Sequence, residues 1–331
     1  MDESTKILII GEIESGSIAQ STKELLAAGR SLADESGKQL CIALTGSNME
    51  SNYQEAINCG ADIVYIINHT LLEKYQPDLY LSAICQASIN IRPSIILISR
   101  NTNGRELAPR LAGRLRVPLA QDCLEVKFQK DSGRMVSYRP VHGGNAMAAI
   151  VCKSDPQIAS IRPKAYEPAE SDPSRVGSFE TIDVELNEEM AKVKMINWVE
   201  DTTEGVQLET ARIVIAGGRG LGGPEPFEDL QKLATLMGGA VGASRAVVDS
   251  GWVPHPLQIG LTGKSISPEL YITVAISGAS QHMAGCSGAK IIVAINKDRQ
   301  ANIFKDSQYG VVGNWQDILP SFTETIRELL S

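Results

Sequence analysis

Two glycine-containing segments in the second half of the chain have the composition of turns that hold phosphate groups. Residues 218–223 read G-R-G-L-G-G after the apolar run 213–216, and residues 277–282 read S-G-A-S-Q-H after the apolar run 271–276. A buried strand that ends in such a turn brings backbone N–H groups close to a phosphate. Two turns behind two strands predict one long cofactor with a pyrophosphate, although a glycine turn can also serve only close packing.

Ser244 and Arg245, which follow the strand expected at residues 240–243, bear on which nucleotide cofactor the site would prefer. A common NAD site has an acidic residue there for the ribose hydroxyls, whereas arginine suits a 2′-phosphate. An NADP-dependent dehydrogenase that uses the glycine turn and Arg245 is therefore one hypothesis. Arg245 is equally suited to place a fixed cation beside an electron-accepting ring, or to form a surface ion pair, and the sequence leaves these interpretations open.

Three further positions carry polar groups that could face a ligand. The loop 258–264 is glycine-rich and offers the hydroxyl of Thr262 to a flavin edge, or is a plain turn. His282 stands near a predicted helix N-terminus, where it would stabilise negative charge on a ligand or be a satisfied core residue. Asn296 and Asp298 follow a strand and would meet an adenine or ribose, or form a polar turn.

The composition of the 331 residues excludes several classes of partner. Aromatic residues make up 5% and the net charge is −8, so neither nucleic acid nor an anionic membrane is an expected partner. The chain has no transmembrane-length apolar run and no signal peptide, which predicts a cytoplasmic protein without membrane insertion. None of the six cysteines forms a C-x-x-C pair, and the histidines lack metal-ligand spacing, so no metal site is expected.

Alternation of apolar runs with helical patterns predicts an α/β fold with two doubly wound, parallel-sheet domains. We place these domains at residues 1–205 and 206–331. In the first, strands are expected at 7–10, 40–44, 63–67 and 95–98, helices at 17–36, 79–89 and 104–115, and a hairpin-like extension at 126–151. A linker or extended arm is expected at 163–178. In the second, helices are expected at 227–237 and 315–330, with strands near 213, 240, 272 and 291–295.

Taken together, the segments of the second domain resemble the α subunit of electron transfer flavoproteins. The resemblance is carried by residues 217–220, 241–245, 258–264, 268–271, 276–282 and 293–298, and more weakly by 104–115 and 143–146. It implies a Rossmann-like FAD-binding C-terminal domain and an adenine-nucleotide hydrolase-like N-terminal domain that packs on a separate β subunit. The implied function is that of an electron carrier rather than a stand-alone enzyme. Its electron donor would be an acyl-CoA dehydrogenase or an NADH-linked partner, and electron bifurcation is left open.

The resemblance also implies roles for individual residues. Arg245 would lie over the isoalloxazine, Thr262 near flavin N5 and His282 near the C2 carbonyl, and these three would tune the flavin. The turn 277–282 would hold the pyrophosphate. The full set expected to line FAD is Arg219, Ser244, Arg245, Gln258, Ile259, Thr262, Ser277, Gly278, Gln281, His282, Asn296, Asp298 and Asn314. Of these, Asn296 and Asp298 would hold the adenosine end, and Asn314 stands where many family members have an acidic residue.

Overall fold

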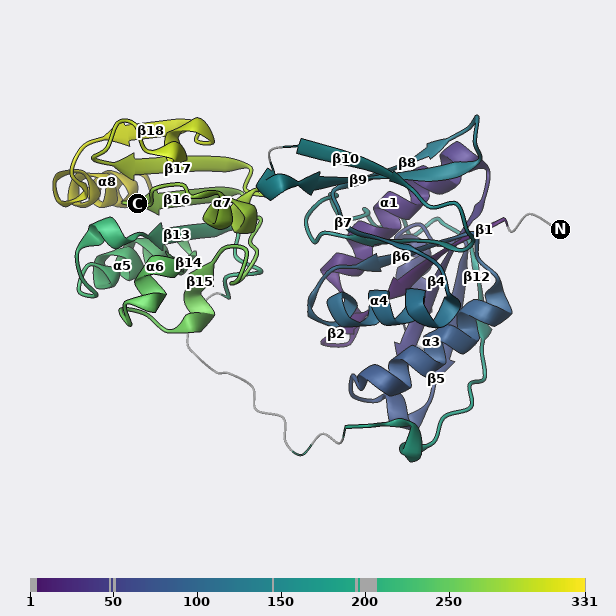
Figure 1. The fold of residues 1–331 in the computed structure, drawn as a ribbon. Coiled ribbons are helices and arrows are strands. Elements are labelled where there is room, and N and C mark those ends of the chain that lie inside the picture. The colour runs from purple at the N-terminus through teal and green to yellow at the C-terminus, as the bar shows by residue number, and fades with distance from the viewer. Residues whose placement is uncertain are drawn as a thin grey trace. The chain divides into compact units, whose positions relative to one another are not determined.

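A computed structural model describes residues 5–47, 49, 52–144, 146–193, 196 and 207–330 (Figure 1). The chain forms two compact units, one made of residues 1–141 and 147–198 and the other of residues 142–146 and 199–331. The domain boundary predicted between residues 205 and 206 lies outside the described residues.

The N-terminal unit is built on a seven-stranded sheet with the order β12-β5-β4-β1-β6-β11-β7. Its strands run parallel, as expected. They are β1 (Lys6–Gly11), β4 (Gln39–Gly46), β5 (Ile63–Asn68), β6 (Ile95–Ser99), β7 (Leu119–Cys123), β11 (Gln157–Ile161) and β12 (Ser178–Thr181). The chain passes from β1 through β4 to β5 and then returns to β6 on the other side of β1, so the winding direction reverses between β1 and β6.

Helices cover both faces of this sheet because alternate residues of its strands point to opposite sides. Ile7 and Ile9 of β1 pack in a core with α1 (Gln20–Ser36), whereas Leu8 and Ile10 pack in a core with α3 (Pro77–Ile91) and α4 (Thr102–Leu115). Shorter elements of this unit are α2 (Tyr53–Asn58), η1 (Thr70–Leu72) and η3 (Glu188–Met190), whereas η2 (His142–Gly144) belongs to the other unit. The doubly wound prediction is confirmed.

The expected hairpin-like extension is present as a three-stranded sheet with the order β10-β9-β8. Its strands are β8 (Glu125–Gln129), β9 (Arg134–Val141) and β10 (Ala146–Val151), and β8 pairs antiparallel with β9. The helix expected from about residue 17 to residue 36 is present, but it begins at Gln20 because β3 (Ser17–Ile18) pairs with β2 (Ile13–Glu14) in a small hairpin.

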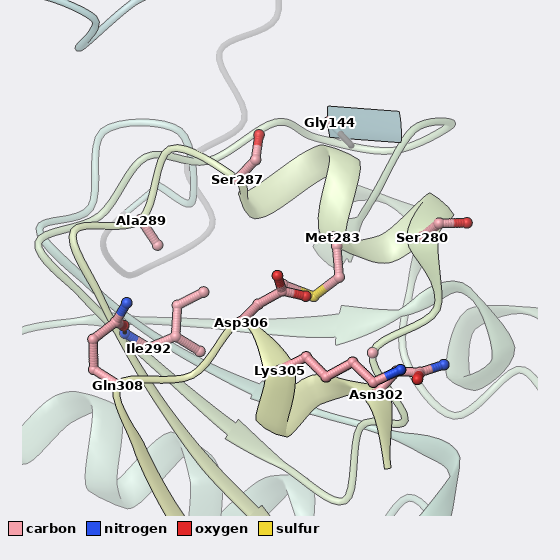
Figure 2. A pocket seen from close by; sticks show the side chains of 11 residues that line it. Gly144, Ser280, Met283, Ser287, Ala289, Ile292, Asn302, Lys305, Asp306 and Gln308 are labelled. Carbon is pink, nitrogen blue, oxygen red and sulfur yellow. Dashed lines mark hydrogen bonds between the residues drawn. The ribbon is translucent and has the colours of Figure 1, made fainter. Parts of the chain in front are cut away.

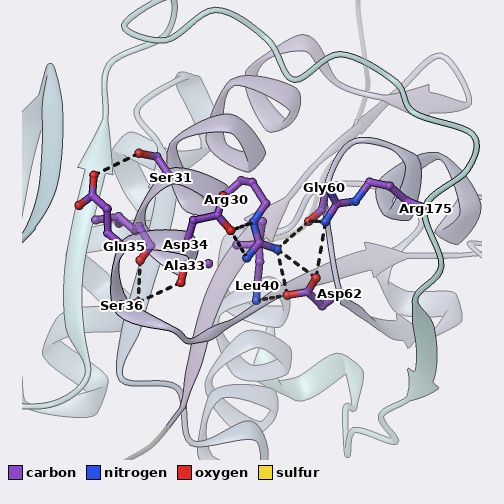
Figure 3. Close-up of polar contacts among 11 residues, drawn as sticks. Arg30, Ser31, Ala33, Asp34, Glu35, Ser36, Leu40, Gly60, Asp62 and Arg175 are labelled. Atoms are coloured by element: carbon purple, nitrogen blue, oxygen red, sulfur yellow. Dashed lines mark hydrogen bonds and ion pairs between the residues drawn. The ribbon is translucent and has the colours of Figure 1, made fainter.

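An arginine on α1 connects that helix to the sheet (Figure 3). Nη1 of Arg30 donates to both carboxylate oxygens of Asp62 at 3.0 Å, and its Nε donates to Asp34 at 2.8 Å. Asp62 stands just before β5, and it also accepts from the backbone N–H of Leu40 in β4 at 2.8 Å. Arg175 approaches the same carboxylate at 3.7 Å. One carboxylate therefore joins α1, β4 and the start of β5.

The C-terminal unit has a six-stranded parallel sheet with the order β15-β14-β13-β16-β17-β18. Its strands are β13 (Ile213–Gly217), β14 (Ala240–Ser244), β15 (Gln258–Ile259), β16 (Leu270–Val274), β17 (Ile291–Asn296) and β18 (Tyr309–Val312). From β13 the chain builds β14 and β15 on one side and then returns to β16 on the other. The winding therefore reverses between β13 and β16.

Both faces of the second sheet are covered, as Figure 1 shows. One core contains residues of α5 (Phe227–Met237), α6 (Arg245–Asp249) and α8 (Trp315–Leu330), and the other contains α7 (Ser280–Cys286) and η6 (Asn302–Lys305). Two further 3-10 turns are η4 (Arg219–Leu221) and η5 (His255–Leu257). Within the described ranges, no helix is long and apolar enough to cross a membrane.

Candidate functional site

The two glycine-containing turns meet where the C-terminal sheet reverses its winding. The N–H of Gly218 donates to the carbonyl of Val274 at 2.9 Å, and a Cβ at Gly218 would lie 2.1 Å from the carbonyl oxygen of Ala275. Ala275 has a positive φ of 57°. Only glycine allows the backbone to approach this closely. The turn after β13 and the turn after β16 are thus parts of one site, in the crevice where open α/β sheets bind ligands.

A cavity of about 80 Å³ lies at the carboxyl ends of these strands and is lined by two of the residues predicted to bind FAD, Asn296 and Asn314. Asn296 Nδ2 donates to the carbonyl of Ile276 at 2.8 Å, and its Oδ1 accepts from the N–H of Asp298 at 2.9 Å. The amide of Asn296 therefore connects the end of β17 to the turn after β16. The side chains of Asp298 and Asn314 are exposed.

Trp315 lines the same cavity, and sequence reasoning did not select it. Its Nε1 is buried without a hydrogen-bond partner. A buried polar group without a partner costs free energy, so a ligand acceptor that reached this indole N–H would remove that cost. The only signal in the sequence was its position directly after Asn314.

The turn predicted to hold the pyrophosphate is closely packed behind its backbone. Gly278 has a φ of 78°, and a Cβ there would lie 2.2 Å from the backbone nitrogen of Ile303. The carbonyl of Ser277 accepts from that same N–H at 3.1 Å. The side chains of Ser277 and Gln281 are exposed, so they are accessible to a ligand. This packing holds the turn in a fixed conformation.

A larger cavity of about 500 Å³ borders the same turn (Figure 2). It is lined by Gly278 and Ser280 of the turn, Met283 of α7, and Asn302 and Lys305 of η6. Of the described residues that line this cavity, only Gly278 is among those predicted to bind the cofactor. Its size alone does not make it the cofactor site, because the predicted residues gather at the strand ends.

The loop 258–264 is joined to α7 by backbone contacts that the sequence did not reveal. The N–H of Leu261 donates to the carbonyl of Gln281 at 2.7 Å, and a Cβ at Gly260 would lie 3.0 Å from that carbonyl oxygen. Within the loop, Nε2 of buried Gln258 donates to Oγ1 of Thr262 at 3.0 Å. The fold thus brings Thr262 and Gln281 into one neighbourhood, with Thr262 exposed.

His282 is buried, and both of its ring nitrogens bond within the protein. Nδ1 lies 3.1 Å from the carbonyl oxygen of Ile259, and Nε2 lies 2.8 Å from the hydroxyl of Tyr271. A carbonyl can only accept, so Nδ1 carries the proton and neutral Nε2 accepts from Tyr271. Burial lowers the pKa of His282 to about 4. The expected contact of this ring with the flavin C2 carbonyl stays a prediction, and it would require one of these two bonds to be exchanged.

Arg219 and Arg245, the two arginines predicted to line FAD, lie on the surface of the C-terminal unit. Arg245 begins α6, its side chain is 66% exposed, and its Nε lies 3.3 Å from Asp249 Oδ2. Arg219 is exposed in η4, and Ser244 is half-buried at the end of β14. In the described part of the chain, no hydrogen bond or ion pair joins either arginine to another predicted site residue. The structure therefore shows the surface ion pair of Arg245, and its place beside a flavin stays a prediction.

The geometry fits a long ligand with a pyrophosphate. Two turns in backbone contact, an indole N–H without a partner at Trp315, and the exposed side chains of Ser277 and Gln281 all lie at or beside the carboxyl ends of the strands. Within the described ranges, no group of three or more His, Cys, Asp or Glu side chains could hold a metal ion. These features are typical of dinucleotide-binding proteins.

Comparisons with known proteins define the class more narrowly. A family model described as "Electron transfer flavoprotein FAD-binding domain" matches residues 207–287, and one described as "Electron transfer flavoprotein domain" matches residues 7–187. The C-terminal unit is therefore an FAD-binding domain. This finding replaces the NADP hypothesis.

Individual relatives agree with the family models over nearly the full length. The "Electron transfer flavoprotein subunit alpha" of Thermoanaerobacterium thermosaccharolyticum is 39% identical, and the alignment covers 99% of this chain and 100% of that relative. That of Bacillus subtilis is 39% identical and covers 98% of each. The "Acryloyl-CoA reductase electron transfer subunit beta" of Anaerotignum propionicum is 34% identical, and the alignment covers 97% of this chain and 95% of that relative. The chain belongs to the electron transfer flavoprotein α subunit family.

Proposed function

We propose that this chain is the FAD-carrying subunit of a heterodimer with an electron transfer flavoprotein β subunit. In this role it accepts electrons from a dehydrogenase and passes them to a downstream acceptor, as an electron carrier rather than a stand-alone enzyme. The observation that supports this most directly is the backbone contact between the turns at Gly218 and Ala275, inside the domain that matches the FAD-binding family. That contact brings both turns together at the carboxyl ends of the strands, where one elongated cofactor would lie.

We propose that the thirteen residues selected from the sequence hold this cofactor. Bound FAD supplies the redox chemistry, while the residues of the chain bind it, orient it and set its electrostatic environment. Arg245 would provide a fixed positive charge, and Thr262 a hydroxyl at the flavin edge. The turn 277–282 would hold the pyrophosphate, and Asn296 the adenosine. Since Asn314 is neutral, the position where many family members have an acidic residue would contribute no carboxylate to the adenosine end.

For the electron donor we propose an acyl-CoA dehydrogenase or an NADH-linked partner. The name of the relative from Anaerotignum propionicum, an electron transfer subunit of acryloyl-CoA reductase, supports a donor or acceptor in acyl-CoA chemistry. An electron-bifurcating form would need a second flavin in the β subunit. We also propose the division at residues 205 and 206 between the unit that packs on the β subunit and the FAD-binding domain.

We further propose that the heterodimer acts in the cytoplasm. All six cysteines are free and buried, which suits a compartment that keeps thiols reduced.

Co-expression with the β subunit tests the proposal directly. The purified heterodimer should be yellow and should bleach when an acyl-CoA dehydrogenase with its substrate, or NADH, is added. Counting flavins per heterodimer then separates a simple carrier from a bifurcating form. The chain expressed alone should contain little FAD if its proposed packing on the β subunit supports the FAD site. A colourless heterodimer, or one whose flavin neither donor reduces, would contradict the proposal.

A further inference from the structure

The N-terminal unit contains its own cavity at the carboxyl ends of β1 and β4. Its volume is about 430 Å³, within the range of small-molecule sites. The lining includes Glu12 after β1, Thr45 at the end of β4, Tyr75 and Tyr80 on the α3 side, and Asn103 in the first turn of α4. Because α4 follows β6, the cavity spans the place where this sheet reverses its winding. It is separate from the FAD-binding domain, and nothing in the proposed function uses it.

The charges around this cavity are negative. Glu12 and Glu73 line it, and no lysine, arginine or histidine does so among the described residues. The carboxylate of Glu12 accepts from Nδ2 of Asn101, the N-cap residue of α4. Glu12 thereby supplies the negative charge that a helix N-terminus favours, and a phosphate at that place would be repelled. Burial raises the pKa of Glu12, as expected of a carboxyl group without a cationic partner.

Two further groups define what the cavity can bind. Thr45 is 8% exposed, and its Oγ1 has no hydrogen-bond partner. The rings of Tyr75 and Tyr80 lie with their centroids 4.9 Å apart, and their hydroxyls bond to the backbone carbonyls of Asn103 and Leu72. With these hydroxyls occupied, the rings offer flat apolar surface. A carboxylate acceptor, a hydroxyl without a partner and aromatic surface together suit a flat molecule with donor groups.

We propose that this cavity binds an uncharged, hydroxyl-bearing small molecule of nucleoside size, whose hydroxyl groups donate to Glu12. Adenosine is a suitable probe because it joins a flat ring to a ribose with two neighbouring hydroxyls. AMP is the matched comparison, since it adds only a phosphate.

The experiment measures binding of adenosine and AMP to the FAD-loaded heterodimer by equilibrium dialysis. Adenosine should bind, and AMP should bind more weakly. Glu12→Gln should weaken adenosine binding by about tenfold or more, because it removes a hydrogen bond to a charged acceptor. Glu14→Gln, at an exposed position outside the lining, is the control and should bind adenosine like the unaltered protein.

Thr45→Val keeps the side-chain shape, and urea denaturation confirms that the N-terminal unit of each variant is folded. This variant should weaken adenosine binding by about threefold if Oγ1 bonds the ligand. The proposal is overturned if adenosine fails to bind, if AMP binds more tightly than adenosine, or if Glu12→Gln and Thr45→Val both leave adenosine binding unchanged. Since FAD content is measured separately, these outcomes do not depend on the electron-carrier function.

Discussion

The hydroxyl of Tyr271 lies 2.8 Å from Nε2 of His282, and both side chains are buried. Tyr271 belongs to the central strand β16, and His282 lies in the first turn of α7. The bond therefore ties the start of α7 to the sheet beneath it. Because the carbonyl of Ile259 takes the Nδ1 proton, the imidazole is held in one neutral tautomer.

This arrangement predicts how stability depends on pH. The pKa of His282 falls from 6.5 to about 4 in the folded chain, so between these values the unfolded state binds more protons. The free energy of unfolding should thus fall as the pH drops from about 6.5 to about 4, by about 3 kcal/mol from this group. Urea denaturation across this pH range measures the effect. His282→Gln should reduce the change in the free energy of unfolding over this pH range. His255→Gln is the control, because His255 is exposed, and it should leave the change as it is in the unaltered protein. Equal slopes in all three proteins would refute the prediction.

Arg245 allows a test of the fixed charge proposed beside the flavin. Its guanidinium is exposed and pairs with Asp249 in the chain alone. Replacing it by alanine removes a cation that favours electron uptake, so the first reduction potential of bound FAD should fall by about 60 mV, a tenfold change for one electron. Arg245→Lys keeps the charge and should recover most of this potential. Redox titration with a reference dye measures both variants. An unchanged potential in Arg245→Ala would place this charge away from the flavin.

Gly218 should tolerate no side chain, because a Cβ there would lie 2.1 Å from the carbonyl oxygen of Ala275. Gly218→Ala must push the two turns apart, which should cost about 3 kcal/mol and strip FAD from the heterodimer. Gly113→Ala is the control. It lies on the exposed surface of α4 with nothing within 4 Å of an added Cβ, and it should stabilise the helix by about 0.5 kcal/mol. Urea denaturation and flavin absorbance measure both. Full FAD occupancy in Gly218→Ala would show that the turns can separate without loss.

Two carboxylates bound to Arg30 should differ in their contribution to stability. Asp62 also accepts from the N–H of Leu40, so Asp62→Ala removes the acceptor of that N–H and the carboxylate partner of Arg30 Nη1, and it should cost about 2 kcal/mol. Asp34 is 67% exposed in an i,i+4 pair, and Asp34→Ala should change the free energy of unfolding by less than about 0.5 kcal/mol. Chemical denaturation compares them. Equal losses would mean that the bond to β4 adds nothing.

Much of the fold could be predicted because local pattern and tertiary role agree. Continuous apolar runs are buried on both faces in β1, β6 and β13, and α5 and α8 have the predicted bounds 227–237 and 315–330. The strands β7 and β11 were missed because their sequences, LAQDC and QIASI, mix polar residues into short runs. Their place in the sheet comes from pairing with distant strands, which no short window contains.

The candidate site, like the fold, could be predicted only in part from the sequence. The sequence by itself determined the two glycine turns and the polar residues after the strands, since these follow from chain order and residue type. Only the tertiary structure decided that Gly218 touches Ala275, that His282 is held by Tyr271, and that the indole of Trp315 lacks a partner. It also decided that Arg245 pairs with Asp249 at the surface. The physical reason is that hydrogen bonding, burial and steric approach depend on which segments the sheet brings together, and parallel pairing brings together segments far apart in the chain.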